Sequence, residues 1–408
     1  MAYIPTALIV ATMDTKGQEA MFLADCLETE GLAVKIIDAG IRGQCLETVA
    51  VTREDVARAG GKSLREVQNI GHEGEALKIM TTGAIECAQE LYRNNQIQGV
   101  IGLGGSMGTT LGSGVMRSFP VGFPKVMIST MASRDTRAFV GTKDILMLHS
   151  VTDLVGLNRI TRKILRNGAL ALAGMLRSAT PDEATDQKPL VFVSTLGTTE
   201  TCAQQIRHTL EEKGNEVVIF HTVGSGGKAM EEMIRQEDVA VLVDLSLHEI
   251  ADHRFGGDYD AGPQRGTVAL DKGIPTILVP GNIDFLVTGP LENAQKQFPG
   301  RPYHVHNAAI TVVRTNQAEI KSLAQTLAGL CNRAKGPVKI LVPMNGFSAF
   351  DHKDGPLHDC EAPGIFLETL KANLDDQTCL EALPFYINDP EFAQAIIDRS
   401  YPIQSDIS

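Results

Sequence analysis

The sequence predicts an α/β protein with two Rossmann-like domains, each built on a parallel sheet and related to each other by internal duplication. Its 408 residues are too many for one hydrophobic core, which stops growing at about 250–300 residues. Residues 7–43 and 190–227 also resemble each other. Both stretches read as a buried strand, a loop rich in Thr and Gly, an amphipathic helix, a glycine turn and a second strand. This order is typical of the opening βαβ unit of a doubly wound sheet.

The duplication is visible at a constant offset. When Leu8 is aligned with Val191, Thr12 meets Thr195, Leu27 meets Leu210 and Gly31 meets Gly214. The two predicted helices carry apolar residues at helical spacing, which are Phe22, Leu23, Cys26 and Leu27 in the first and Cys202, Ile206 and Leu210 in the second. A glycine follows each helix, as expected for a helix C-terminus.

The remaining elements follow the same alternation. In the first half we expect a helix over 73–94, strands over 99–103 and 125–129, and a helix rich in small residues over 151–176, whose close approach to other helices suggests a dimer or interdomain surface. In the second half we expect strands over 240–245, 276–280, 309–313 and 338–343, with a helix over 317–330. The hydrophilic stretch 178–188 has linker composition, so we predict domains over 1–180 and 188–408.

Composition excludes several classes of protein. Apolar residues make up 43% and charged residues 21%, which is typical of a globular chain. The net charge of −12 argues against direct binding to nucleic acid or to an anionic membrane. The seven cysteines include no CxxC pair, and neither a basic segment followed by an apolar run nor a membrane-length apolar run is present. We therefore expect a cytoplasmic protein.

The strongest local feature is the glycine-rich segment GLGGSMGTT at residues 102–110. It follows a predicted buried strand and precedes a predicted helix, so backbone N–H groups and hydroxyls can surround a phosphate at the helix N-terminus. The candidate cofactor-binding residues in it are Gly102, Gly104, Gly105, Ser106, Met107, Gly108 and Thr109. The alternative is a tight strand–helix turn without a ligand. No Gly-Lys-Ser/Thr of a P-loop follows, and Lys125 stands where a dinucleotide-binding site would need an acidic residue.

Two further loops are expected at the same edge of the sheet, because ligands bind outside the carboxyl ends of parallel strands. The first holds Asp14, Thr15 and Lys16, in which Asp14 could bind Mg²⁺ or a ribose hydroxyl and Lys16 a phosphate. The alternative role of Asp14 and Thr15 is to cap the N-terminus of a helix. The second holds Thr130 and Ser133. Arg134 and Lys143 are the nearest further cations in the sequence, unless they belong to a solvated face.

In the second half, acidic and histidine residues gather in DLSLHEIADH at 244–253. His248, Glu249 and His253 do not have the HExxH spacing of a zinc protease. Asp244 ends a predicted strand and Glu249 follows it, so both are candidate acid–base groups or Mg²⁺ ligands, with His306 from a later loop as a third catalytic candidate. The alternative role of Asp244 and Glu249 is that of acidic residues at a helix start or of surface charge. No metal site is assigned.

Four segments together resemble one family. They are ATMDTKGQE at 11–19, GLGGSMGTT at 102–110, MASRDTRAFVGTKDI with HSVTDLVGLNRI at 131–160, and INDPEFA at 387–393. This set is similar to uncharacterised protein family 0261, the ATP-binding-domain family of the tomato mosaic virus resistance protein. The resemblance implies two α/β domains, ATP bound by the first one, and a homodimer. It supports the glycine loop together with Asp14, Thr15, Lys16, Thr130 and Ser133.

Two functions follow from these observations and both stay open. In the first, the protein holds ATP in its N-terminal domain, with Mg²⁺ as a further candidate cofactor, and acts as an enzyme on a small carboxylated or sugar-like metabolite in a cleft between the domains. In the second, it is a nucleotide-binding regulatory module that binds a protein partner without turnover. ATP consumption with a purified metabolite would favour the first, and saturable binding without turnover the second.

Overall fold

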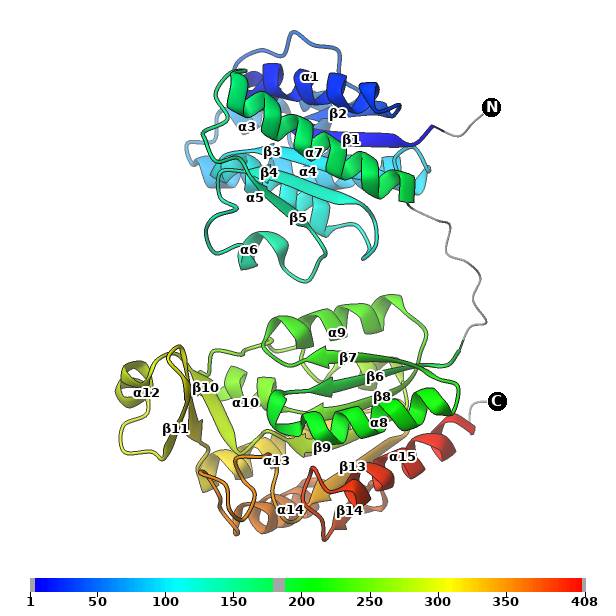
Figure 1. Cartoon of the computed structure of the whole chain (residues 1–408), viewed down its shortest axis with the longest axis vertical. Helices are drawn as coiled ribbons and strands as arrows, with labels where there is room; N and C mark the ends of the chain where they lie inside the picture. Colours follow the sequence, from blue (N-terminus) through cyan, green and yellow to red (C-terminus); the bar gives the residue numbers. More distant parts are fainter. Residues whose placement is uncertain (1–3, 179–187, 406–408) are drawn as a thin grey trace. The chain divides into compact units, whose positions relative to one another are not determined.

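The computed structural model describes residues 4–178 and 188–405 of the chain (Figure 1). The chain divides into two compact units, Met1–Glu183 and Ala184–Ser408, which are described separately below. The predicted linker, 178–188, lies outside the described residues except for its two ends. Within the described ranges, no helix has both the length and the apolar character needed to cross a membrane.

The N-terminal unit alternates strands and helices along its whole length. Its elements are β1 (Thr6–Ala11), α1 (Met13–Thr29), β2 (Ala33–Asp38), α2 (Arg53–Ala59), α3 (Leu64–Gln68), α4 (Glu73–Arg93), β3 (Gly99–Gly104), α5 (Ser106–Arg117), β4 (Lys125–Ser129), α6 (Arg137–Val140), β5 (Leu146–His149) and α7 (Arg159–Ser178). The strands form one parallel sheet in the order β2-β1-β3-β4-β5.

Both faces of this sheet are covered. Along β1, Ala7, Ile9 and Ala11 pack with α1 and α7, whereas Leu8 and Val10 pack with α2, α4 and α5 on the opposite face. This two-sided burial explains why the strands read as nearly continuous apolar runs in the sequence. Figure 1 shows α1 and α7 lying together over one face.

The C-terminal unit contains a larger parallel sheet and a small antiparallel one. Its elements are β6 (Leu190–Thr195), η1 (Gly197–Thr199), α8 (Glu200–Glu212), β7 (Glu216–His221), α9 (Ser225–Gln236), β8 (Val239–Ser246), α10 (His248–Phe255), α11 (Val268–Lys272), β9 (Thr276–Gly281), β10 (Phe285–Thr288), α12 (Leu291–Gln297), β11 (Tyr303–Asn307), β12 (Ile310–Arg314), α13 (Gln317–Cys331), β13 (Val338–Pro343), α14 (Ala362–Asn373), η2 (Gln377–Cys379), β14 (Leu380–Leu383) and α15 (Pro390–Ser405). The parallel sheet has the order β14-β13-β9-β8-β6-β7, and the antiparallel sheet has the order β10-β12-β11.

The predicted fold class is confirmed, because both parallel sheets follow the same rule of connection. In each unit the first strand lies between the second and the third, and the next strands add beside the third. This order of 2-1-3-4-5 is that of flavodoxin-like sheets. The paired segments of the duplication are β1–α1–β2 and β6–α8–β7.

Two predicted elements were wrong in part. The strand expected over 309–313 exists as β12, but it pairs antiparallel with β10 and β11 and lies outside the parallel sheet. The helix expected over 151–176 begins only at Arg159, and Val151 adopts a φ of +62°, which a β-branched residue rarely does.

The small residues of α7 are explained by its own domain. A Cβ added at Gly168 would lie 2.5 Å from Cδ1 of Ile128, and Ala169 and Ala173 are buried in the same core. Small side chains therefore let α7 approach the sheet closely. This packing within the N-terminal unit accounts for the small residues without the predicted dimer surface.

Candidate functional site

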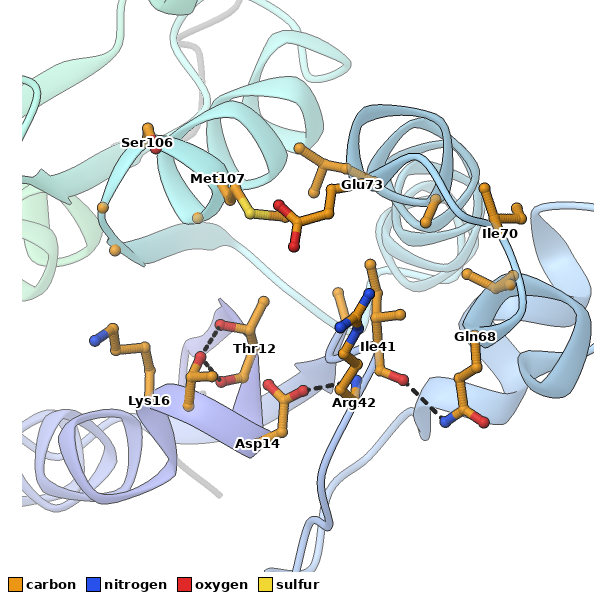
Figure 2. A pocket seen from close by; sticks show the side chains of 18 residues that line it. Thr12, Asp14, Lys16, Ile41, Arg42, Gln68, Ile70, Glu73, Ser106 and Met107 are labelled. Atoms are coloured by element: carbon orange, nitrogen blue, oxygen red, sulfur yellow. Dashed lines mark hydrogen bonds between the residues drawn. The ribbon is translucent and has the colours of Figure 1, made fainter.

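A pocket of about 390 Å³ lies in the N-terminal unit, at the carboxyl ends of β1, β2 and β3 (Figure 2). Pockets that bind small molecules typically enclose about 300–1,000 Å³. Its lining residues are Thr12, Asp14, Thr15, Lys16, Ala39, Ile41, Arg42, Val67, Gln68, Ile70, Glu73, Ala76, Leu77, Gly104, Gly105, Ser106, Met107 and Gly108. Because β1 continues into α1 on one face and β3 into α5 on the other, the pocket occupies the switch point of the sheet.

The N-terminus of α5 borders this pocket, and no side chain of the described residues caps it. Its N-cap residue is Gly105, which has no side chain to accept a hydrogen bond. The N–H of Thr109 makes the first helical hydrogen bond, to the Gly105 carbonyl at 2.8 Å. The N–H groups of Ser106, Met107 and Gly108 precede it and are left for a ligand. Together with the helix dipole, these donors favour an anion at this point.

The glycines of this segment differ in what requires them. A Cβ at Gly104 would lie 2.8 Å from Cα of Gly108, so β3 and α5 could not cross as closely as they do. Gly102 lies inside β3, where a Cβ would meet Sδ of Met127 at 2.9 Å. At Gly105, in contrast, the nearest atom to a Cβ would be Oγ1 of Thr130 at 3.9 Å. Packing within the described residues thus does not require glycine at 105, whereas a ligand lying against the backbone would.

The turn after β1 is held by a buried ion pair. Asp38 accepts hydrogen bonds from the N–H of Met13 at 3.0 Å and of Gly40 at 2.8 Å. Its other oxygen accepts from Nε of Arg53 at 2.8 Å, and both side chains are almost completely buried. This pair joins the start of α1 to the loop after β2.

Asp14 faces the pocket from that turn. Its Oδ2 accepts from the N–H of Arg42 at 2.9 Å, and its Oδ1 has no hydrogen bond within residues 4–178. The hydroxyls of Thr12 and Thr15 lie 2.8 Å apart beside it. Glu73 lies on the opposite wall (Figure 2). Two carboxylates therefore face a space that also holds free N–H groups.

The structure brings together eight of the twelve predicted cofactor-binding residues as pocket lining, which are Asp14, Thr15, Lys16, Gly104, Gly105, Ser106, Met107 and Gly108. The other four, Gly102, Thr109, Thr130 and Ser133, lie outside the lining. Thr109 is buried, and its hydroxyl bonds Ser129 at 2.6 Å and the Gly105 carbonyl at 2.7 Å. Lys16 lines the pocket, but its ammonium donates to the Leu154 carbonyl.

The sequence reasoning missed Arg42 and the apolar wall of the pocket. Arg42 follows β2 at its carboxyl end, so the strand-end rule that selected Asp14 could have found it. The wall comes from the loop after β2, from α3, from α4 and from the turn between these two helices. No local pattern in the sequence shows that these segments fold over the edge of the sheet. Of the cations considered instead, Arg134 is exposed and Lys143 is buried, and neither lines the pocket.

The predicted catalytic residues of the second half do not form an open site. Asp244 and Glu249 are completely buried and share Arg265, whose guanidinium donates to Asp244 at 2.6 Å and to Glu249 at 2.7 Å. Oε1 of Glu249 also accepts from the N–H of Gly224 at 2.7 Å and of Gly227 at 3.0 Å. An internal carboxylate thus occupies the N-terminus of α9, where an external anion would otherwise bind.

His306 lies elsewhere, so the predicted grouping of the three residues is corrected. It is exposed on β11 of the antiparallel sheet, and its ring centre lies 6.4 Å from that of Phe350. Asp244 and Glu249 do not form the predicted site because Arg265, a residue later in the chain, pairs with both carboxylates. Among the described residues, no group of three or more His, Cys, Asp or Glu side chains is placed to hold a metal ion.

Comparison with known proteins assigns the family. The models described as "Uncharacterised protein family (UPF0261) N-terminal domain" and "Uncharacterised protein family (UPF0261) C-terminal domain" match residues 5–181 and 188–403. The chain belongs to the UPF0261 family. A UPF0261 protein of Clostridium tetani is 37% identical over 393 residues, covering 96% of this chain and 97% of that protein. The resemblance inferred from the four sequence segments is therefore confirmed.

A plant member of UPF0261 is also similar. The ToMV resistance protein Tm-1(GCR237) of Solanum lycopersicum is 32% identical over 418 residues, covering 97% of this chain but 55% of that protein. Among solved structures, MurG of Acinetobacter baumannii matches 98% of this chain and 99% of its own, with a TM-score of 0.25 and 11% identity. This last similarity is too weak to support any statement about function.

The UPF0261 C-terminal domain contains a second buried charge cluster, around Arg314 at the end of β12. Its Nη1 lies 3.6 Å from Asp284 and its Nη2 lies 3.4 Å from Asp351. Asp284 also accepts from the hydroxyl of Ser348 at 2.6 Å. Asp351 accepts from the N–H groups of Phe347 and Asp359, both at 3.1 Å, and so closes the loop after β13. Burial, and then the nearby carboxylate of Asp284, raise the pKa of Asp351 to about 7.

This raised pKa predicts a pH dependence of stability. In the unfolded chain Asp351 titrates near its ordinary pKa of 3.8, so between that pH and about 7 the folded domain binds a proton that the unfolded chain does not. Folding is therefore favoured at the acid end of this range, and the free energy of unfolding falls as the pH rises toward 7. Urea titrations at several pH values across the range are expected to show this fall in the wild type and a weaker one in Asp351→Asn.

The informative quantity is the slope of the free energy of unfolding with pH. The value at a single pH is not sufficient, because Asp351→Asn also removes a hydrogen-bond acceptor and shifts the stability at every pH. Asp354→Asn, whose side chain is 78% exposed in the same loop, is the matched control and is expected to keep the slope of the wild type. An unchanged slope in Asp351→Asn would show that this carboxyl does not bind the proton.

Proposed function

We propose that the N-terminal UPF0261 domain binds ATP in the pocket at the switch point of its sheet, with the phosphates at the N-terminus of α5. The observation that carries the proposal is Gly105. It lines the pocket and stands at the N-cap position of a helix whose first N–H groups have no acceptor among the described residues. A Cβ there would have only Oγ1 of Thr130 within 4 Å, at 3.9 Å, so the space beside it is open. These are the features by which helix N-termini hold phosphate.

The opposite part of the pocket suits a nucleotide base. Its wall is apolar and consists of Ile41, Val67, Ile70, Ala76 and Leu77. Nε2 of Gln68 donates to the Ile41 carbonyl at 2.9 Å and joins α3 to the loop after β2. A pocket that joins an apolar wall to a few polar groups suits a ligand with a flat ring at one end and charge at the other.

Mg²⁺ fits the same site as a companion of the phosphates. Mg²⁺ in nucleotide sites is usually held by one or two carboxylates together with phosphate oxygens and water. Asp14 would hold it through the Oδ1 atom that has no partner within the N-terminal described range, and Glu73 is the second carboxylate on the pocket wall. The ion would neutralise part of the phosphate charge that the missing P-loop lysine leaves unmatched.

Gly105→Val tests this proposal. The side chain would fill the space against the first turn of α5, so we expect the ATP affinity to fall at least about a hundredfold while the fold is kept. At a hundredfold excess over Kd, ATP should stabilise the wild type by about 2.7 kcal/mol and the variant hardly at all. Thermal unfolding and calorimetric titration with ATP, with and without Mg²⁺, measure both quantities.

The matched control is Gly174→Val, in the exposed part of α7, where a Cβ would meet nothing within 4 Å. We expect it to bind ATP as the wild type does. ATP binding that survives in Gly105→Val, or that is absent from the wild type, would overturn the proposal.

A second candidate, a nucleotide-binding module without turnover, is favoured by the burial of Asp244 and Glu249 against Arg265. The enzymatic alternative, acting on a small carboxylated or sugar-like metabolite, stays a prediction. Steady release of ADP in the presence of a panel of such metabolites would support the enzyme, and saturable ATP binding without release would support the module.

A further inference from the structure

We propose that Arg42 is the residue that binds the outer phosphates of the nucleotide, facing the N-terminus of α5 across the pocket. This inference rests on the function proposed above and adds to it the cation that the site requires. A triphosphate carries several negative charges, whereas a helix N-terminus supplies the equivalent of only about half a positive charge. Asp14 and Glu73 add negative charge to the pocket, which one Mg²⁺ ion would offset only in part, so a further cation is needed.

Among the described residues, two cationic side chains line the pocket, Lys16 and Arg42. Lys16 interrupts the helical geometry of α1, with φ of −126° and ψ of 17°. Its ammonium donates to the Leu154 carbonyl, and in Figure 2 the side chain points away from Asp14 and the centre of the pocket. Lys16 is thus already engaged outside the space that a ligand would fill.

The backbone of Arg42 is fixed on both sides. Its N–H donates to Oδ2 of Asp14 at 2.9 Å, and its carbonyl accepts from Nη1 of Arg53 at 2.9 Å. Arg53 is itself held by Asp38, with Nη2 2.7 Å from Oδ2. Asp14 directly, and Asp38 through Arg53, therefore fix the backbone position of Arg42. This reduces the conformational entropy that is lost when the Arg42 side chain binds a ligand.

The guanidinium of Arg42 is free to bind. It has no hydrogen bond or ion pair within the described part of the N-terminal unit, and Figure 2 shows it directed into the pocket. A guanidinium binds phosphate oxygens in a bidentate manner, which an ammonium cannot do.

The order of the strands places Arg42 opposite the helix. Because β1 lies between β2 and β3, the Arg42 loop after β2 and the α5 N-terminus after β3 flank the turn that carries Asp14. A phosphate chain lying over that turn would be bound by N–H groups on one side and by Arg42 on the other. Arg42 therefore determines binding of the phosphates, and the apolar wall determines binding of the base.

This division gives a test that separates the two ends of the ligand. Calorimetric titrations with adenosine, ADP and ATP would be made on the full chain, on Arg42→Ala and Arg42→Lys, and on the control Arg134→Ala. Arg134 is exposed and does not line the pocket. For Arg42→Ala we expect ATP affinity to fall about tenfold to a hundredfold, as for a lost charged hydrogen bond, with adenosine affinity unchanged. Arg42→Lys should lie between, and Arg134→Ala should match the wild type.

A second readout is the effect of salt. The ATP affinity of the wild type should fall more steeply with added NaCl than that of Arg42→Ala, because one exposed charge pair is missing in the variant. If Arg42→Ala binds ATP as tightly as the wild type, or loses adenosine and ATP equally, the role of Arg42 is wrong and the nucleotide site stands. If the wild type binds none of the three ligands, the proposed function fails, and this inference with it.

Discussion

Arg265→Met is expected to lower the free energy of unfolding of the C-terminal domain by about 3–5 kcal/mol. Arg265 is almost completely buried and pairs with Asp244 and Glu249, which are completely buried. Methionine fills much of the same volume but leaves both carboxylates without their cation in a medium that solvates charge poorly. The fall arises from these stranded charges and much less from the lost bonds themselves.

Urea unfolding of the full chain, followed by a probe in the C-terminal domain, measures this change. Arg207→Met, on the exposed side of α8, is the control and should stay within about 0.5 kcal/mol of the wild type. Adding Asp244→Asn to Arg265→Met should recover part of the loss, because one unpaired charge is removed. A loss below about 1 kcal/mol in Arg265→Met would show that water reaches the cluster and that it is not closed.

The fold could be predicted because its signals are local. The strands of both parallel sheets are buried on two faces, so they appear as apolar runs, and the helix between β1 and β2 repeats its spacing in α8. The strands of the antiparallel sheet could not be distinguished in the sequence from those of the parallel sheet. The segment of β12 is as apolar as a parallel strand, and only its pairing with β10 and β11 distinguishes it. Pairing depends on residues far apart in sequence.

The candidate site residues also fall into a group that the sequence could predict and a group that it could not. Asp14 and the segment from Gly104 to Gly108 were found because strand ends and glycines are visible in sequence. Asp244 lies near the carboxyl end of β8 and Glu249 follows that strand. Both are nevertheless closed off by Arg265, which lies 21 residues beyond Asp244 and 16 beyond Glu249. Nothing in the spacing of an acidic residue shows whether a later arginine folds onto it. The partner of a charge therefore has to come from the structure.

Asp38→Asn is expected to destabilise the N-terminal domain by about 3–5 kcal/mol and to abolish the proposed ATP binding. Asp38 and Arg53 are 1% and 6% exposed in their side chains, and their oxygen and nitrogen lie 2.7 Å apart. An amide in place of the carboxylate leaves the guanidinium charge buried beside the carbonyls of Arg42 and Gly43. The amide would also have a single side-chain acceptor oxygen. It could therefore accept either from the N–H groups of Met13 and Gly40 or from Arg53, whereas the two carboxylate oxygens accept from both.

The effect on binding follows from what the ion pair joins. Asp38 holds the first N–H of α1, and Arg53 holds the carbonyl of Arg42, so the turn of Asp14 and the loop of Arg42 lose their common anchor. Urea unfolding and calorimetric ATP titration measure the two effects. The control is Asp25→Asn, exposed on α1, which should change stability by no more than about 0.5 kcal/mol.

The double variant Asp38→Asn/Arg53→Met decides whether the stranded charge is the cause. If it is, the double variant should be less destabilised than the sum of the single variants, because the second substitution removes the unpaired cation. ATP affinity should nevertheless stay low in the double variant, since the anchor of the Arg42 loop is still missing. Strict additivity of the two substitutions, or recovery of ATP binding together with stability, would mean that the pair does not position the site.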